Sequence, residues 1–466
     1  MQLYSFTSEL NYALNTLTSP VGVVAVLIFL VFLVLSLLNP WVKWVAITLI
    51  IWISSVAFFI DARQQLPVPL AFPLQSIAAQ GRPLTTGLLL LLVPAALFAP
   101  RGWRRKLIGA PAILLFIFQL VLSARIWISG VPDRAIVSFF IFVLMFLALS
   151  LGFGKWLQTW DDVNKLVRCI VCAGAINAIA TLYQLAMNRS VALAGHRLMG
   201  VNGNPQGLAI ACALALPPAL YLLGRAAEPK FWRVFSGIVA GFLIMMVLWS
   251  GSRTGILMCL VGVTVIFWSR LGRLLAVGII AGLVALFAIQ FYEQSTLTMT
   301  ELLTRGDTRT QIWRQMIEAF VANPVAGMME SGYGAGENSY LSVAAQMGLI
   351  GVIPLMAFLV ATFVGFVKIF RWRAWLGSER QFADVVVAGN LSLLVGAVFE
   401  GYLMGTLVPS VICLIIYLAL MTFVIDAAKL NWEQSNLLGA EAGIDGGELA
   451  YEYATPGDYQ SVGSPF

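Results

Sequence analysis

The chemistry that this chain could perform is concentrated in one polar stretch, Gln290–Gly351, which interrupts a strongly apolar sequence. Arginine guanidinium groups bind phosphate oxygens in a bidentate way and stay charged in surroundings of low polarity. A carboxylate beside them can accept a proton during a transfer reaction. The stretch contains both kinds of group, in the order Arg305, Asp307, Arg309, Arg314, a glycine-rich turn through Gly332, Gly334 and Gly336, and then Glu337 and Asn338. This composition predicts a site for an anionic ligand at which a proton is moved.

Two further arginines lie in short polar segments between apolar runs. Arg197 is followed by Gly200 and Asn204, which favour a tight turn. Arg253 lies within the segment Ser250–Gly255, where it has almost no loop in which to avoid the hydrocarbon. A charge at that depth usually faces a cavity or a partner, although an arginine at a helix end can also extend toward water. Both interpretations of Arg253 stay open at this point.

Arginines on three separate elements suit an anionic ligand that reaches the membrane surface, such as a sugar linked to a lipid through pyrophosphate. The arginine charges would stabilise the lipid pyrophosphate as it leaves, and Glu337 would accept the proton of the acceptor hydroxyl. The predicted catalytic residues are Glu337 and Arg253, and the predicted pyrophosphate-binding or glycan-binding residues are Arg197, Arg253, Arg305, Arg309, Asn204, Trp313, Asn338 and Tyr340. We expect neither a metal nor another cofactor, because no paired carboxylates with metal-binding spacing accompany these residues.

Other polar or reactive residues carry weaker signals. Glu400 lies near the end of an apolar run, and we expect it to pair with one of the arginines or to act in the site. His196 is the only histidine. It could act as a base or simply face water, but one histidine cannot build a metal site. The five cysteines lie in apolar runs and are expected to be inert packing residues.

Composition indicates the class of fold that must position these residues. Of the 466 residues, 60% are hydrophobic and 11% are charged, whereas soluble domains carry about 25% charged residues. Continuous apolar runs of roughly 20 residues predict membrane-spanning helices and not the alternating strands of a barrel. We therefore expect an all-α polytopic membrane protein of about 12–13 spans, over residues 21–38, 42–60, 84–99, 107–128, 136–154, 169–187, 205–222, 235–250, 255–269, 274–291, 341–369, 385–402 and 407–425.

Lysines and arginines collect in alternate loops, for example Arg101–Lys106 and Arg371–Arg380, which predicts that these loops are cytoplasmic. The long polar stretch and the N-terminus then lie outside. The formal net charge of +6 is explained by this asymmetry, and no clustered basic face indicates nucleic acid. Residues 1–426 form the predicted membrane domain, 292–340 its external loop, and 427–466 an acidic, disordered cytoplasmic tail.

The external loop is expected to contain a helix over 308–321, with Asp307 as its N-cap. Apolar residues recur at helical spacing along one face of this segment, namely Ile312, Trp313, Met316, Ile317 and Phe320. The segment is too short and too polar to span a membrane, so we expect it to lie on the membrane surface with the apolar face down. Arg305 and Arg309 at its positive end would be unfavourable unless an anion binds there.

The order of these motifs resembles the O-antigen ligase and Wzy-type polymerase superfamily over roughly residues 190–355. The resemblance implies an inverting membrane glycosyltransferase of the GT-C type, which uses undecaprenyl-pyrophosphate-linked glycans at the periplasmic face of the bacterial inner membrane. The residues that carry it are Arg197, Gly200, Asn204-Pro205, Ser250-Gly-Ser-Arg253-Thr-Gly255, Arg309, Trp313, Pro324, Gly332-Tyr-Gly-Ala-Gly336, Glu337-Asn338-Ser-Tyr340-Leu341 and Gly348-Leu-Ile-Gly351.

One position departs from the pattern, because the ligases have a histidine where this chain has Glu337. This difference favours a polymerase that extends a polysaccharide repeat, possible partners being a chain-length regulator or an export complex. A ligase or a protein O-glycosyltransferase is the second reading. A transporter is the rival class, but transporter sites lie near the midplane, often between internal repeats. Here the charges gather at the outer edge and no repeat is evident.

Overall fold

The computed structural model describes residues 39–56, 70–103, 106–194, 196–268, 309–328 and 337–441, together with Val34. The predicted span at 274–291, nearly all of the one at 21–38, Arg305, Asp307 and the glycine-rich turn lie outside these residues. Predictions about them therefore stay predictions.

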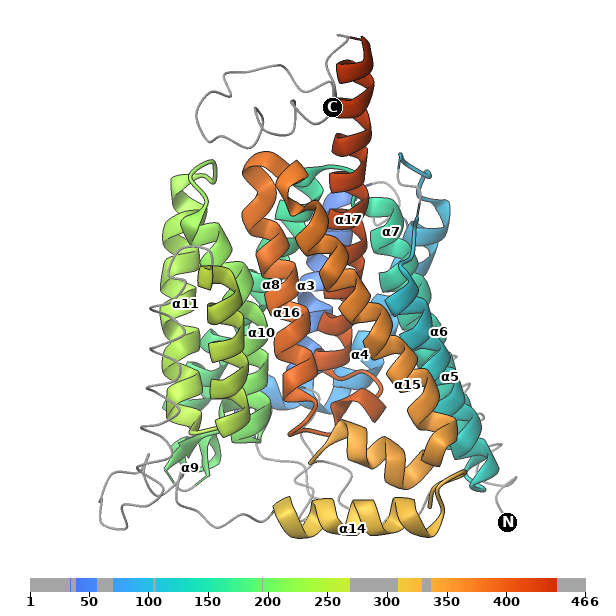
Figure 1. The fold of residues 1–466 in the computed structure, drawn as a ribbon. Helices are drawn as coiled ribbons and strands as arrows, with labels where there is room; N and C mark the ends of the chain where they lie inside the picture. The colour runs from blue at the N-terminus through green and yellow to red at the C-terminus, as the bar shows by residue number, and fades with distance from the viewer. Residues whose placement is uncertain are drawn as a thin grey trace.

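Long helices packed side by side make up most of the described chain (Figure 1). In chain order they are α3 (Pro40–Val56), α4 (Leu74–Phe98), α5 (Ala110–Ile128), α6 (Pro132–Met145), which continues through the π-helical η1 (Phe146–Leu151) into α7 (Gly152–Trp156), α8 (Trp160–Met187), α10 (Pro205–Gly224), α11 (Lys230–Ser250), a helix over Arg253–Trp268, α15 (Ser339–Trp372), α16 (Arg380–Gly396) and α17 (Pro409–Glu441). The shorter elements are α9 (Arg189–Ala192), η2 (Gly200–Asn202), α14 (Arg309–Ala322), η3 (Arg373–Glu379), η4 (Tyr402–Met404) and the antiparallel strands β1 (Leu193–Ala194) and β2 (Arg197–Leu198).

Eight helical segments of the described residues are long and apolar enough to cross a membrane, and one of them, Ser339–Gly396, comprises both α15 and α16. Two shorter apolar helices, Trp41–Val56 and Arg253–Trp268, belong to the same bundle. These findings confirm the prediction of an all-α polytopic membrane protein. The predicted number of spans includes the two segments that lie outside the described residues.

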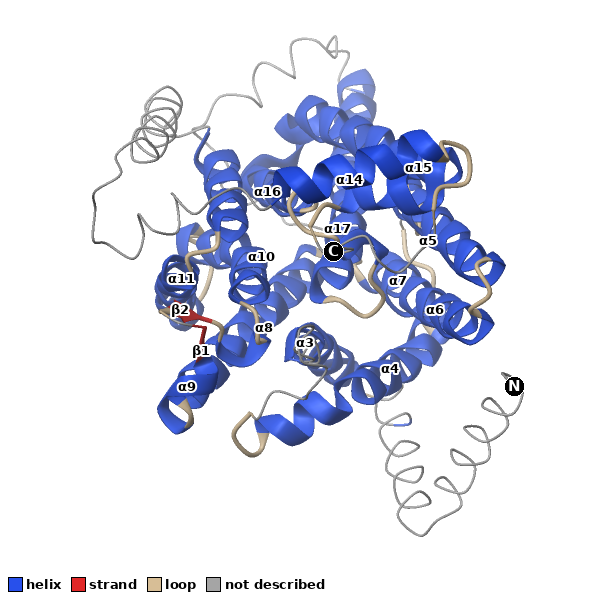
Figure 2. Ribbon diagram, turned by 90° about the horizontal axis from the view of Figure 1, so that it is seen from below, coloured by secondary structure: helices blue, strands red, loops and turns tan. Residues whose placement is uncertain are grey.

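Helix α17 runs through the centre of the bundle (Figure 2), and 89% of its most apolar stretch is buried. The Tyr417 hydroxyl donates to the Leu214 carbonyl of α10 at 2.9 Å, and the Asn390 amide of α16 donates to the Tyr417 carbonyl at 3.2 Å. Gly389 lets the helices approach, because a Cβ there would lie 2.2 Å from the Tyr417 ring. In hydrocarbon such polar contacts need internal partners, so they fix how α10 and α16 stand against α17.

Ion pairs connect the helices at the end of the bundle opposite α14 (Figure 1). The Glu228 carboxylate, whose side chain is 1% exposed, accepts from Arg168 at 2.6 Å and from Arg225 at 3.4 Å. Arg225 also binds Glu379 of η3. A buried carboxylate needs such partners, and the two arginines join α8, the α10–α11 loop and the α15–α16 connection.

Several predicted boundaries are corrected by the structure. The predicted span at 84–99 begins ten residues too late, because residues 74–83 form the beginning of α4. The predicted span at 169–187 also begins too late, because α8 begins at Trp160, where Thr159 and Asp162 form a capping box. The predicted disorder from residue 427 is wrong as far as Glu441, where α17 ends.

The polar part of α17, after residue 426, packs against other elements. Its polar composition did not predict this packing. The rings of Trp432 and Trp372 lie 5.1 Å apart, and the Asn431 amide donates to the Trp375 carbonyl at 2.8 Å. Lys429 and Glu433 pair at i,i+4 spacing along the helix. These contacts hold a polar helix against the α15–η3 connection.

The predicted span at 341–369 is divided by a kink at Gly348, whose φ is 59°. The short helix before the kink lies across the end of the bundle above α14, and the long helix after it runs along the bundle (Figure 1). The kink leaves backbone amides without helical acceptors. Leu349 and Ile350 donate instead to the carbonyls of Pro324 and Val325, at 2.8 and 3.3 Å.

The substitution Gly348→Ala is expected to destabilise the protein by about 1–3 kcal/mol from backbone strain, with a further cost from steric overlap. A Cβ at this position would lie 2.5 Å from the Val325 carbonyl oxygen and 2.6 Å from that of Pro324. Gly241→Ala in α11 is the control, because nothing lies within 4 Å of a Cβ there. Thermal unfolding in detergent, followed by tryptophan fluorescence, measures both. Equal melting temperatures for the two variants would contradict the role of the kink.

Candidate functional site

Several of the predicted site residues that the structure describes, among them Arg309 and Glu337, lie at the end of the bundle with α14. Four segments meet there: the start of the helix Arg253–Trp268, α14, the start of α15, and the residues between α16 and η4. Figure 1 shows that α14 lies across the ends of the long helices and does not run parallel to them. The site is therefore assembled from segments that are far apart in the sequence.

The turn between α11 and the next helix presents Arg253. Gly251 ends α11 in a left-handed conformation with φ 57°, and the Ser252 hydroxyl accepts from the Gly255 amide at 3.2 Å. Arg253 is the exposed first residue of the new helix. The Arg197 guanidinium donates to the carbonyls of Ser250 and Gly251, at 2.8 and 3.4 Å. Arg197 thus caps the carboxyl end of α11, where a cation is favourable, and fixes the turn on which Arg253 sits.

Glu400 lies in the turn that follows the end of α16 at Gly396. The prediction that its span extends to residue 402 is wrong, because α16 stops six residues earlier. The expected ion pair is confirmed, since Arg309 Nη2 lies 3.4 Å from Glu400 Oε1. Burial raises the pKa of Glu400 to about 8, the Arg309 charge opposes this rise, Glu337 adds to it and the Thr254 side chain opposes it.

Glu337 is held beside Glu400 by its neighbour Ser339. The Ser339 amide donates to the Ala397 carbonyl at 2.8 Å, and its hydroxyl donates to the Glu400 carbonyl at 2.6 Å. That hydroxyl also accepts from the Leu403 amide at 3.2 Å. The Oε2 atom of Glu337 is buried, and among the described residues it has no hydrogen-bond partner. A buried carboxylate oxygen in this condition is suited to bind a donor group of a ligand.

Three predicted binding residues have structural roles here. Asn204 caps α10 by accepting from the Gln206 amide at 2.8 Å. The Asn338 side chain caps α15 by accepting from the amides of Tyr340 and Leu341, each at 2.9 Å. The Tyr340 hydroxyl donates to the Leu394 carbonyl at 2.8 Å. These side chains order the site backbone, and their ligand-binding role stays a prediction.

Helix α14 begins and ends within one residue of the predicted bounds, at Arg309 and Ala322. Met316 and Ala319 are buried and pack against Ala345 of α15, so that the apolar face rests partly on protein. Ile317, predicted to belong to this face, is 50% exposed because it lies on a different side of the helix from Met316.

Trp313 and the loop after α14 complete the contacts of this helix. The Trp313 ring lies 6.2 Å from the ring of Phe399, and its Nε1 is buried without a partner among the described residues. Arg125 of α5 donates to the Ala326 carbonyl. A charged side chain within a membrane-spanning helix needs such a polar partner. Together these contacts fix α14 against the segment that carries Glu400.

The other candidate features do not belong to this site. His196 is exposed, and no group of three or more metal-binding side chains occurs in the described part of the chain. The five cysteines are free, as predicted, and three of them are buried. Sequence reasoning did not single out Thr254, Ser339 or Phe399, whose only signal was that they adjoin the residues it selected.

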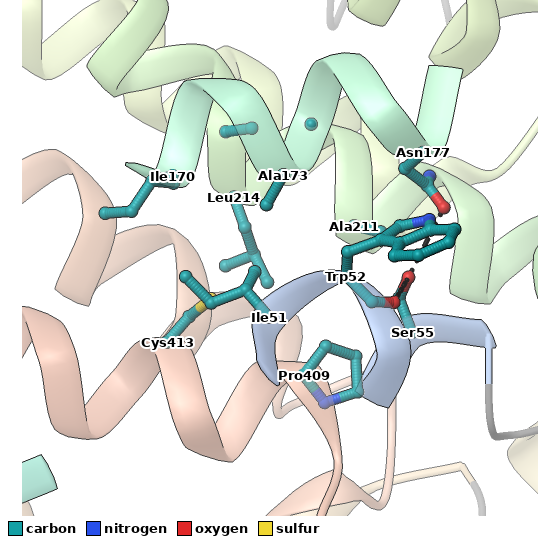
Figure 3. Close-up of a pocket in the computed structure, with 12 residues that line it drawn as sticks. Ile51, Trp52, Ser55, Ile170, Ala173, Asn177, Ala211, Leu214, Pro409 and Cys413 are labelled. Carbon is teal, nitrogen blue, oxygen red and sulfur yellow. Dashed lines mark hydrogen bonds between the residues drawn. The ribbon is translucent and has the colours of Figure 1, made fainter. Parts of the chain in front are cut away.

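A small cavity lies away from the site, among α3, α8, α10 and α17 (Figure 3). Its volume is about 20 Å³, room for little more than a water molecule. Figure 3 shows Trp52, Ser55 and Asn177 together at one side, where the Ser55 hydroxyl donates to Asn177 Oδ1 at 3.3 Å. The remaining lining is apolar, and the cavity is too small for a sugar.

Two substitutions of Asn338 distinguish its role as the N-cap of α15 from a role in binding the ligand. Asn338→Ala is expected to lower stability by about 1 kcal/mol and to displace Glu337, whereas Asn338→Ser restores a good N-cap. Both the melting temperature and any transfer activity should therefore recover in the serine variant. An active-site role for the amide itself would instead leave Asn338→Ser stable and inactive.

Comparison with known families adds an independent finding to this geometry. Residues 238–356 match the family model described as O-antigen ligase. The match confirms the resemblance and spans Arg253, Arg309 and Glu337, while Arg197 and Glu400 lie outside it. A search of curated proteins found no match.

Proposed function

We propose that this chain, with its O-antigen-ligase-like segment over residues 238–356, is a membrane glycosyltransferase that uses a lipid-pyrophosphate-linked glycan. The observation that carries the proposal is the buried Oε2 of Glu337, which has no hydrogen-bond partner among the described residues and lies near Glu400, the partner of Arg309. A base needs a lone pair that is not already used in a hydrogen bond, and cationic groups nearby must bind the leaving group. This cluster and the turn that presents Arg253 supply both.

In the proposed reaction the acceptor hydroxyl oxygen attacks the anomeric carbon while Glu337 takes the hydroxyl proton. The bond from that carbon to the pyrophosphate oxygen breaks, and the lipid pyrophosphate leaves with the electron pair. Attack from the side opposite the leaving group inverts the configuration. Arg253 stabilises the charge that develops on the pyrophosphate, and the chain's own residues perform each step without a metal.

The acceptor that we favour is a growing polysaccharide chain, so that the enzyme is a polymerase. The reason is Glu337, which stands where the ligases have a histidine. An O-antigen ligase that transfers the glycan to lipid A-core, or a transferase to protein, shares the donor and the leaving group, and the family match supports it equally. Purified protein given lipid-linked repeats or lipid A-core as acceptor distinguishes the two by product length and identity.

The proposal includes a location and partners. The bacterial inner membrane, with the site at the periplasmic face, fits the distribution of basic loops and the lipid-linked donor. A chain-length regulator or an export complex would be a partner for a polymerase. The competing transporter function predicts uptake of labelled solute into vesicles without any lengthening of glycan.

The variant Arg253→Ala is expected to lose about 10²–10³ in transfer rate, the usual effect of removing a group that stabilises developing charge. Its amount in the membrane should be unchanged, because the side chain is exposed. Glycan transfer by purified protein and immunoblotting of membranes measure the two quantities. Arg314→Ala, on the outer side of α14, is the control. Polymer of wild-type length and rate in Arg253→Ala would count against the site.

The variant Glu337→Gln is expected to lose about 10²–10⁴ in transfer rate, because the amide cannot accept a proton. The size of the side chain is kept, so binding of a polyprenyl pyrophosphate should persist. Glu318→Gln is the matched control, since Glu318 is 62% exposed on α14 and pairs with Arg314. Full activity of Glu337→Gln would leave Glu337 with a structural role only.

A further inference from the structure

Glu400 is a second carboxylate in the site, and the reaction above does not use it. Its side chain is 13% exposed, and its Oε1 lies 3.4 Å from Arg309 Nη2. The Arg309 guanidinium also lies over the Phe399 ring, 5.6 Å from the ring centre. The backbone of Glu400 is fixed by the Ser339 hydroxyl. The main chain of Glu400 is therefore held at the site.

Charged, titratable or hydroxyl groups face Glu400 from the elements packed around it. Arg309 belongs to α14, Glu337 precedes α15, Thr254 lies in the helix that Arg253 begins, and Tyr402 follows in η4. The pKa of Tyr402 is raised well above its ordinary value by burial, so Tyr402 stays neutral. Arg309 attracts the Glu400 carboxylate and Glu337 repels it.

We propose that Glu400 is a positioning residue which carries a proton while the donor's pyrophosphate is bound at Arg309, so that donor binding takes up a proton from alkaline solution. The inference rests on the proposed function, since it concerns the same donor. It goes beyond that function because it assigns a protonation state and a positioning role to Glu400, which lies outside the matched residues 238–356.

The physical reason is competition for one guanidinium. A phosphate oxygen that binds Arg309 weakens its attraction for the Glu400 carboxylate and brings further negative charge beside it. A buried carboxylate without compensation is unfavourable, and the least costly response is to accept a proton from solvent. The proton then lies on a Glu400 oxygen, and Glu337 is left to act as the base.

The direction of the pH dependence follows from this arrangement. In the ligand-free protein burial raises the pKa of Glu400 to about 8, so the group is mostly neutral at pH 7. Bound pyrophosphate raises the pKa further. Above about pH 8 the free protein must therefore gain a proton to bind the donor, and affinity falls by up to about tenfold per pH unit. Below that pH the affinity does not depend on Glu400.

The test is binding of a fluorescent polyprenyl pyrophosphate to the purified full-length protein, measured from about pH 6.5 to 9.5. Wild type should bind with constant affinity up to about pH 8 and more weakly above it. Glu400→Gln, which keeps a neutral side chain at every pH, should lack this alkaline loss. Glu318→Gln, in the exposed pair on α14, should behave as wild type does. Calorimetry of wild type at about pH 9, in two buffers of different ionisation enthalpy, should show uptake of close to one proton.

Two outcomes bear on the role of Glu400, and a third bears on the proposed function. An alkaline loss of the same size in Glu400→Gln and wild type overturns the role of Glu400. So does the absence of proton uptake in wild type at about pH 9, a measurement that needs no variant to fold. Failure of wild type to bind the probe at every pH would refute the proposed function itself.

Discussion

The candidate site depends on the hydrogen bonds of one buried serine. Ser339 is 0% exposed, and its amide and hydroxyl join the start of α15 to the carbonyls of Ala397 and Glu400 and the amide of Leu403. Each of these backbone groups would otherwise be buried without a partner, at a cost of about 1–3 kcal/mol. The same bonds set Glu337 and Glu400 beside each other. The fold thus brings two carboxylates together through backbone contacts, although their charges oppose it.

The kink at Gly348 solves a second problem that the membrane imposes. A span must satisfy its own backbone, and a break in a helix leaves amides exposed to an apolar medium. The carbonyls of Pro324 and Val325 supply the missing acceptors, and the Met328 amide bonds to Ala345 in return. Helix α14 and the beginning of α15 consequently form one folded layer across the end of the bundle. Arg309 and Glu337, on those two elements, are positioned by this layer.

The sequence was most informative where a single physical rule decides the structure. Apolar length and the low charge content predicted the helices, and helical spacing predicted α14 to within one residue at each end. It was less informative about polar side chains, because their partners are backbone groups placed by tertiary structure. Binding of the ligand by Arg197 and Asn204 stays a prediction, and the sequence did not show that the Arg197 side chain caps α11 and that of Asn204 caps α10. The end of α16 before Glu400 carries no clear stop signal in the sequence.

A carboxylate base brings a negative charge that a histidine base does not bring. The rest of the site must therefore compensate for that charge. A neutral histidine adds no charge beside a pyrophosphate, whereas Glu337 adds one, and a second carboxylate would add another. Arg309 lies 3.4 Å from Glu400, and in the proposed reaction the donor would compete for the same guanidinium. A site with two ionised carboxylates would repel its own substrate, so one of them has to be neutral. The Glu400 side chain is 13% exposed and paired with Arg309, and Oε2 of Glu337 has no hydrogen-bond partner among the described residues. In the proposed reaction the bound proton therefore lies on Glu400, and Glu337 is the residue that accepts the proton of the acceptor hydroxyl.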